Sequence, residues 1–180
     1  LERSLEALAR CVDAGKNSAL GLSNFTSTLI RTAHQIAPIS AVQIPFSLAA
    51  QRAEEDIACC EELGISVIAY GVLAQGMLSG KYTPESSFPP DDRRSRLPHF
   101  QGEAYRRNIG GVQRIKTLAI LSRRTAAQIA IRWVLDNPAV SAVLVGAKGP
   151  EHVEENVGAL GWRLELRDRQ EVAQHFAVRH

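Results

Sequence analysis

The stretch Gly64-Ile65-Ser66-Val67-Ile68-Ala69-Tyr70 decides the fold of this chain. It is an almost wholly apolar run that begins at a glycine, and such runs are typical of strands buried on both faces of a parallel sheet. The run ends in a tyrosine and leads into the small-residue segment 71–76. Because ligands of parallel α/β folds bind beyond the carboxyl ends of strands, Tyr70 is either a stacking surface for a flat ligand or a closing residue of the core.

The rest of the chain alternates between strand and helix patterns around this stretch. Short apolar runs predict three more strands, at 18–22, 41–44 and 140–145. Amphipathic periodicity and stop signals predict helices at 1–14, 26–36, 52–63, 105–119, 125–136, 150–160 and 167–177. In the second of these helices, Thr26 or Ser27 is expected to cap the first turn, and Leu29 to face inward. Four strands that each precede a helix specify a parallel α/β sheet with right-handed crossovers.

The segment 82–101 breaks this rhythm. Prolines, serines and charged residues replace the periodic pattern there. Unstructured segments of this length are uncommon inside domains and are often functional or mobile. We therefore expect a long surface loop at 82–101.

Composition excludes several classes of function. The formal net charge is only +2, and the arginine clusters are interleaved with polar or acidic residues, so we expect no nucleic-acid partner. No apolar run is long enough to span a membrane, and the cysteines and histidines show no metal-ligand spacing. Cys11, Cys59 and Cys60 are odd in number and fall in predicted helices, which indicates a reducing compartment and a cytoplasmic protein.

Each predicted strand is followed by groups suited to bind a ligand. These groups are Ser23 and Asn24 after the first strand, Gln43 on the second, Tyr70, segment 71–76 and Lys81 after the third, and Lys148, His152, Glu155 and Asn156 after the fourth. The N-terminus of a helix that begins at Pro150, with the positive charge of Lys148 beside it, favours binding of an anion. Each group alone could equally be structural, for example Asn24 as a helix cap. Polar groups at the carboxyl ends of all four strands together indicate a ligand site.

Two common nucleotide motifs do not fit. A phosphate loop needs a glycine five residues before Gly80 and a hydroxyl residue after Lys81, where Gln75 and Tyr82 stand instead. No Gly-x-Gly-x-x-Gly follows a predicted strand, so the signature of a dinucleotide-binding Rossmann turn is also absent.

Taken together, these segments resemble the aldo-keto reductases. The likeness rests on Gly21-Leu22-Ser23-Asn24-Phe25, on Val42-Gln43-Ile44, on residues 64–82, on 127–135, and on Gly146-Ala147-Lys148 with Glu155-Asn156. It implies a (β/α)8 TIM barrel, of which this chain would hold the C-terminal four βα units, a half barrel, plus a C-terminal helix. Residues 1–180 would then form a single partial domain.

The resemblance also implies an NADP(H)-dependent oxidoreductase that reduces aldehydes or ketones to alcohols. Ser23, Asn24 and Gln43 would bind the nicotinamide carboxamide, and Tyr70 would stack on its ring. The pyrophosphate would lie under Lys81 and the loop Gly71, Val72, Leu73, Ala74, Gln75 and Gly76. The adenosine and its 2′-phosphate would be surrounded by Gly146, Lys148, His152, Glu155 and Asn156. Family members more often have Ser-Pro at 71–72 and Gln or Arg at 152, so the preference for NADPH over NADH stays open.

The family's catalytic aspartate, tyrosine, lysine and histidine come from the first four barrel strands. No catalytic residue is therefore expected in this chain, and we expect the chain alone to be inactive. The alternatives are a non-catalytic nucleotide-sensing or interaction module and an inactive truncated remnant. A half barrel would expose two unpaired strand edges, near Ala19 and Val143, so we expect the isolated chain to form a homodimer or to aggregate. The substrate would be a small-molecule carbonyl compound.

Overall fold

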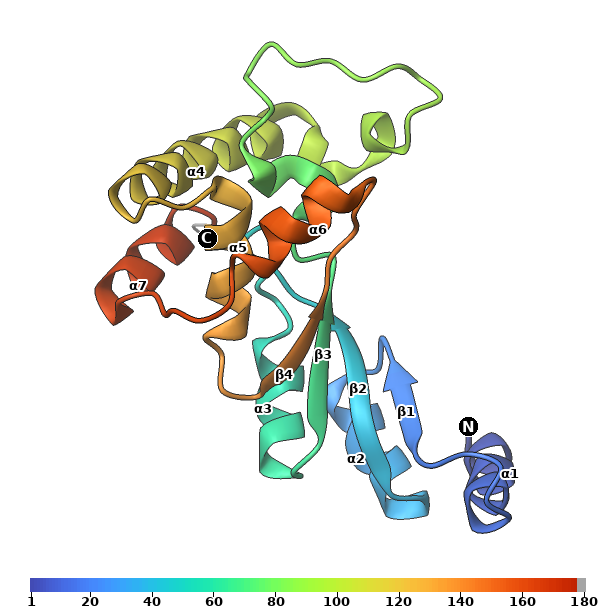
Figure 1. The fold of residues 1–180 in the computed structure, drawn as a ribbon. Helices are drawn as coiled ribbons and strands as arrows, with labels where there is room; N and C mark the ends of the chain where they lie inside the picture. The colour runs from blue at the N-terminus through green and yellow to red at the C-terminus, as the bar shows by residue number, and fades with distance from the viewer. Residues whose placement is uncertain (178–180) are drawn as a thin grey trace.

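The strands form one parallel sheet whose order follows the chain. The computed structural model describes residues 1–177 (Figure 1). Its strands are β1 (Leu20–Ser23), β2 (Ile39–Pro45), β3 (Ser66–Tyr70) and β4 (Val140–Leu144), adjacent in the order β1-β2-β3-β4. All three pairs are parallel, with Ser23 opposite Gln43 and Tyr70 opposite both Pro45 and Leu144. The predicted parallel α/β sheet is confirmed, and the carboxyl ends of its strands lie at one edge.

Helices follow the strands as the sequence pattern predicts. They are α1 (Glu2–Asp13), α2 (Ser27–Ile36), α3 (Glu54–Glu62), α4 (Gly102–Leu121), α5 (Ala126–Leu135), α6 (Pro150–Val157) and α7 (Leu166–Gln174), with short 3-10 helices η1 (Ala74–Ser79), η2 (Arg93–Arg96) and η3 (Pro98–Phe100). In residues 1–177, no helix combines the length and the apolarity that crossing a membrane requires.

Helices cover only one face of the sheet. In β3, Val67 and Ala69 are fully buried, whereas Ser66 is exposed and Ile68 and Tyr70 are half-buried. The prediction that this strand is buried on both faces is therefore wrong for the described residues. The physical reason is that α2, α3 and α5 lie on the same side of the sheet (Figure 1). Successive crossovers that are all right-handed place their helices on one side when the strands follow one another in order. We call the uncovered side the open face.

The start of α2 differs from the expectation. Neither Thr26 nor Ser27 caps the helix with its side chain; instead the backbone N–H of Ser27 donates to Oδ1 of Asp56 at 2.6 Å. Leu29, expected inside, is 43% exposed, because α2 packs on the sheet through Ile30 and Ala33. The carboxylate of Asp56 on α3 thus takes the place of a local side-chain cap at the start of α2 and links the two helices.

The helix α5 forms the buried centre behind β4. Thr125 and Gln128 make a complete capping box at its start, and the core side chains include Ile129, Ile131 and Val134. Gln128 also donates from Nε2 to the backbone oxygen of Glu155 at 2.9 Å. One residue thereby caps α5 and holds α6, the helix that follows the last strand.

Candidate functional site

The open face of the sheet carries the first group of predicted site residues. Ser23 and Gln43 are register partners on neighbouring strands, so their side chains emerge on the same face, and Tyr70 has the same parity on β3. The hydroxyl of Tyr70 donates to Oδ1 of Asn24 at 2.7 Å, which joins the exits of β3 and β1 across β2. Asn24 adopts a left-handed φ of 60°, a conformation that asparagine tolerates better than most residues.

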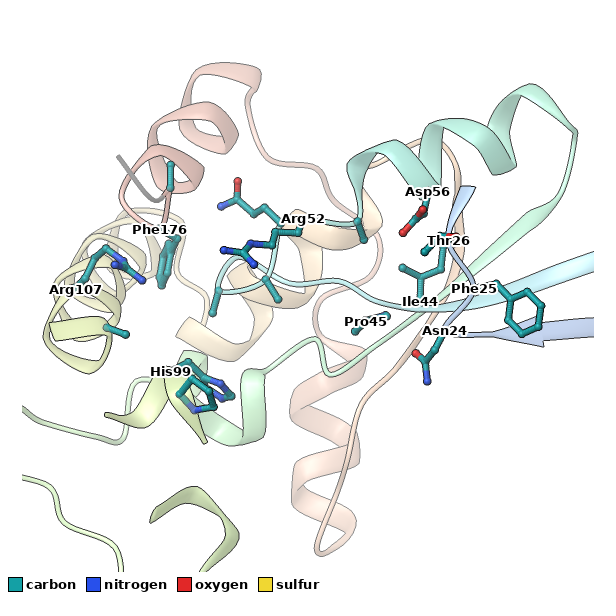
Figure 2. Close-up of a pocket in the computed structure, with 17 residues that line it drawn as sticks. Asn24, Phe25, Thr26, Ile44, Pro45, Arg52, Asp56, His99, Arg107 and Phe176 are labelled. Carbon is teal, nitrogen blue, oxygen red and sulfur yellow. The ribbon is translucent and has the colours of Figure 1, made fainter. Parts of the chain in front are cut away.

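Asn24 also lines a cavity of about 780 Å³ at the carboxyl edge of the sheet. The cavity runs from the exit of β1 past the β2–α3 loop to the first turn of α4 and Phe176, and we call it the β1–β2 cavity. Figure 2 shows Asn24, Thr26 and Asp56 toward one end, and Arg52, Arg107, His99 and Phe176 toward the other. None of the residues at this second end was proposed as a site residue from the sequence.

The loop after β3 turns sharply through left-handed backbone. Residues 74, 75 and 76 have consecutive φ values of 46°, 53° and 88°. A Cβ atom on Gly76 would lie 3.3 Å from Nζ of Lys81, so the absence of a side chain at 76 lets the lysine fold back over the turn. The loop thus leaves the backbone at Gly76 uncovered by a side chain and places the ammonium group of Lys81 next to it. Such an arrangement is suited to bind a phosphate.

A second cavity of about 700 Å³ separates this loop from the exit of β4. We call it the β3–β4 cavity. The predicted site residues that line it are Gly71, Val72, Leu73, Gln75, Gly76, Lys81, Gly146, Lys148, His152, Glu155 and Asn156. The predicted residues Ser23, Asn24, Gln43, Tyr70 and Ala74 do not line it. The first four belong to the strands or strand ends described above, and Ala74 is buried beneath the turn.

Cations dominate the charge of the β3–β4 cavity. Its lining residues include Lys81, Arg94 and Lys148, against the single carboxylate of Glu155. Arg94 comes from η2, inside segment 82–101, which was expected to be a long surface loop. No sequence signal identifies it, because neither motif nor periodicity links position 94 to the strand exits.

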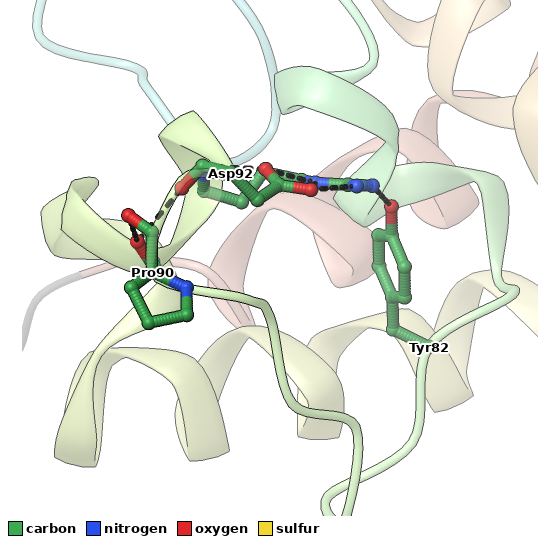
Figure 3. Close-up of polar contacts among 5 residues, drawn as sticks. Tyr82, Pro90 and Asp92 are labelled. Atoms are coloured by element: carbon green, nitrogen blue, oxygen red, sulfur yellow. Dashed lines mark hydrogen bonds and ion pairs between the residues drawn. The ribbon is translucent and has the colours of Figure 1, made fainter.

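Arg94 is held in place by its neighbours. Its guanidinium donates to both carboxylate oxygens of Asp92 and to the hydroxyl of Tyr82, and it lies 4.8 Å from the centre of the Phe88 ring. Figure 3 shows the carboxylate of Asp92 and the hydroxyl of Tyr82 joined by this row of polar contacts. The hydrogen bonds from Arg94 lower the pKa of Asp92 to about 2, and those to Asp92 raise the pKa of Arg94. Lys148 lowers the pKa of Asp92 further, so the segment carrying η2 lies near the exit of β4.

The start of α6 presents a histidine to the same cavity. The backbone N–H of Lys148 donates to Nδ1 of His152 at 3.4 Å. The same nitrogen lies 3.4 Å from Oε1 of Glu151, so the ring is held between the loop before α6 and the first turn of this helix. His152, Glu155 and Asn156 all line the cavity, in agreement with their expected placement on one face of the helix.

Among residues 1–177, no group of three or more His, Cys, Asp or Glu side chains could hold a metal ion. The two regions together offer an anion cradle beside an open face that carries an aromatic ring, two amides and a hydroxyl.

The sequence and the fold of this chain both resemble those of known proteins. The model of the "Aldo/keto reductase family" matches residues 1–176. The chain is 33% identical to "Aldo-keto reductase yakc [NADP(+)]" of Schizosaccharomyces pombe, with 100% of this chain and 56% of that protein covered. It is 31% identical to "Aldo-keto reductase YhdN" of Bacillus subtilis, with 96% and 53% covered. The chain thus spans about half the length of the curated relatives it matches.

Solved structures agree on the fold. The glycerol dehydrogenase AKR11B4 from Gluconobacter oxydans superposes with a TM-score of 0.90 at 31% identity, with 97% of this chain and 53% of that chain covered. The holo form of the aldo-keto reductase AKR11C1 from Bacillus halodurans has a TM-score of 0.76 at 22% identity, a likeness of fold alone. The chain belongs to the aldo/keto reductase family.

Proposed function

We propose that this chain forms the cofactor-binding half of an NADP(H)-dependent reductase that converts aldehydes or ketones to alcohols. The observation that carries the proposal is the continuity between the open face at Tyr70 and the cationic β3–β4 cavity, which begins at the next residue, Gly71. An extended dinucleotide needs both parts: a flat surface for a ring at one end and cations for its phosphates.

The residues present fit such a cofactor. Three cations line a cavity whose volume is within the range of about 300–1,000 Å³ that is usual for small-molecule sites. At Gly71 and Gly146 an added Cβ would meet no atom within 4 Å, so the backbone there stays accessible to a bulky ligand. When bound, the nicotinamide would supply the hydride for carbonyl reduction.

The roles follow from position. Tyr70 would support the nicotinamide ring, with Ser23, Asn24 and Gln43 oriented toward its carboxamide. Gly71, Val72, Leu73, Ala74, Gln75 and Gly76 would form the turn against the pyrophosphate, and Lys81 and Arg94 would neutralise its charge. Gly146, Lys148, His152, Glu155 and Asn156 would surround the adenosine and its 2′-phosphate.

We further propose that the four βα units are one half of a (β/α)8 barrel. The open face and the coverage of about half of each relative support this. In such a barrel the general acid would come from the other half, so the 180-residue chain alone would not reduce a carbonyl. The free thiols of Cys11, Cys59 and Cys60 support a cytoplasmic location.

A half barrel also predicts self-association. Within the described sheet, β1 and β4 each have one unpaired edge, and unpaired edges recruit further strands. We therefore propose that the isolated chain forms a homodimer that closes both edges. Sedimentation velocity would test this: a concentration-dependent dimer is expected, and a monodisperse monomer at all concentrations would contradict it.

Titration of the purified chain with NADPH, followed by calorimetry, tests the proposed function. We expect saturable binding, and we expect Lys148→Gln to weaken it about tenfold through loss of a charge-assisted contact. Lys16→Gln, a matched exposed lysine beyond α1, should leave the affinity unchanged. Parallel titration with NADH measures the contribution of the 2′-phosphate. No binding at millimolar NADPH would exclude the proposal for this chain.

A further inference from the structure

The far end of the β1–β2 cavity gathers two arginines and a histidine from distant parts of the chain. Arg52 comes from the β2–α3 loop, His99 from η3 and Arg107 from the first turns of α4. In Figure 2 these side chains surround the same end of the cavity as the ring of Phe176. An end built from two guanidinium groups and an aromatic ring suits an organic anion.

Neither arginine is paired within the part of the chain that the structure describes. Among residues 1–177, Arg52 and Arg107 take part in no ion pair and in no side-chain hydrogen bond. The Nε2 atom of His99 is buried and also has no hydrogen-bond partner in this part of the chain. The carboxylate of Asp56, at the opposite end, receives the N–H of Ser27 instead. Within the described residues, the two guanidinium groups therefore line the cavity without an ion-pair or hydrogen-bond partner.

The walls of this end are held by contacts between elements. Gln51 donates from Nε2 to the backbone oxygens of Leu48 and Ala173, which ties the loop of Arg52 to α7. Asn108 donates to the backbone oxygen of His99 at 3.0 Å, which ties η3 to α4. The protein's own contacts thus preorganise the site, which lowers the entropic cost of binding a ligand.

The other end of the cavity meets the proposed cofactor site at one residue, Asn24, whereas Ser23, Gln43 and Tyr70 do not line it. Asn24 lines it and accepts the hydrogen bond of Tyr70, the ring assigned above to the nicotinamide. We propose that the β1–β2 cavity binds carbonyl substrates that carry a carboxylate or phosphate, with the carbonyl toward Asn24 and the anionic group between Arg52 and Arg107. The substrate role rests on the proposed function, whereas the anion site stands on the geometry of the cavity.

A pair of probes that differ only in charge tests the proposal. 4-Carboxybenzaldehyde and its neutral methyl ester are titrated separately into the purified protein and followed by calorimetry. We expect the acid to bind at least about tenfold more tightly, since charge-assisted contacts to two arginines are lost in the ester. Sodium chloride should weaken binding of the acid and leave that of the ester unchanged. Equal affinities for the two probes would overturn the proposal.

Variants on exposed positions locate the site. Arg52→Gln and Arg107→Gln should each reduce the affinity for the acid about tenfold and leave that for the ester unchanged. Arg106→Gln, the adjacent exposed arginine of α4 that does not line the cavity, should have no effect. Equal losses in all three variants would indicate a diffuse surface charge effect and would overturn the assignment.

NMR tests the orientation of the bound probe. Nuclear Overhauser contacts from the formyl proton of 4-carboxybenzaldehyde to Thr26 are expected, and contacts to Phe176 instead would contradict the proposed orientation.

NADPH binding measured on the same samples separates the two proposals. Normal NADPH binding with no preference for the acid would refute the anion site and leave the reductase function standing. A clear preference for the acid without NADPH binding would retain the anion site and refute its role as a substrate site.

Discussion

The hydroxyl of Tyr70 and the amide oxygen of Asn24 are 2.7 Å apart, although β2 lies between their strands in the sheet. This hydrogen bond spans the carboxyl edge of the sheet and fixes the tilt of the half-buried ring. It also couples the exits of β1 and β3, the two regions from which the β1–β2 and β3–β4 cavities begin.

Substitutions of Tyr70 separate the ring from its hydroxyl. Tyr70→Phe should change the dissociation constant of NADPH only slightly, because the aromatic face remains. Tyr70→Ala should raise it roughly five- to one-hundred-and-fifty-fold, because aromatic stacking on a base is usually worth about 1–3 kcal/mol. Calorimetric titration measures both. Similar losses in the two variants would mean that the hydroxyl, not the ring, carries the interaction.

Two adjacent glycines of α4 should respond oppositely to alanine. A Cβ on Gly111 would lie 2.6 Å from the ring of Phe176, whereas one on Gly110 meets nothing within 4 Å. Gly111→Ala should lower the free energy of unfolding by about 1–2 kcal/mol through overpacking. Gly110→Ala should raise it by about 0.5–1 kcal/mol through helix propensity. Urea denaturation measures both, and equal signs would refute the close packing of Phe176 on Gly111.

The capping box of α5 predicts a local loss of stability. Thr125→Ala removes the side chain that accepts from the N–H of Gln128, at an expected cost of about 1 kcal/mol in the free energy of unfolding. Thr117→Ala, on the exposed surface of α4, is the matched control and should change it by less than about 0.5 kcal/mol. A larger effect at Thr117 than at Thr125 would contradict the cap.

The ion pair between Asp92 and Arg94 predicts a pH dependence. The pKa of Asp92 is lowered to about 2, so its ionised form stabilises the folded segment above the ordinary carboxyl range near about 4, and that contribution is lost as the pH falls toward 2. Carbon-13 NMR of the carboxyl group should show this low midpoint. Arg94→Gln should shift the midpoint upward, and Arg93→Gln should not. An unchanged midpoint in Arg94→Gln would exclude the pairing.

Much of the fold was predictable because its signals are local. The apolar runs at 64–70 and 140–145 and the amphipathic periodicity of the helices depend on neighbours along the chain, and the corresponding strands and helices are present. The burial of β3 was not predictable in this way. The same apolar run suits a strand covered on one face or on two, and only the common side taken by the helices decides between them.

The site residues also differ in whether local sequence could identify them. The loop glycines with Lys81, and His152, Glu155 and Asn156 at helical spacing, could be named from the sequence because each set lies within one short segment. Arg94 could not, and neither could the cluster of Arg52, His99 and Arg107, because residues far apart in the chain meet only after the crossovers are formed.

By itself, the sequence determined the order of strands and helices, the parallel sheet and the residues at each strand exit, since these follow from periodicity, steric preference and chain direction. The tertiary structure alone decided which exits share a cavity, that Asp56 rather than a local side chain meets the start of α2, and that Tyr70 bonds to Asn24. These contacts depend on the twist and packing of the sheet, and no local pattern encodes the distance between groups that the chain brings together from afar.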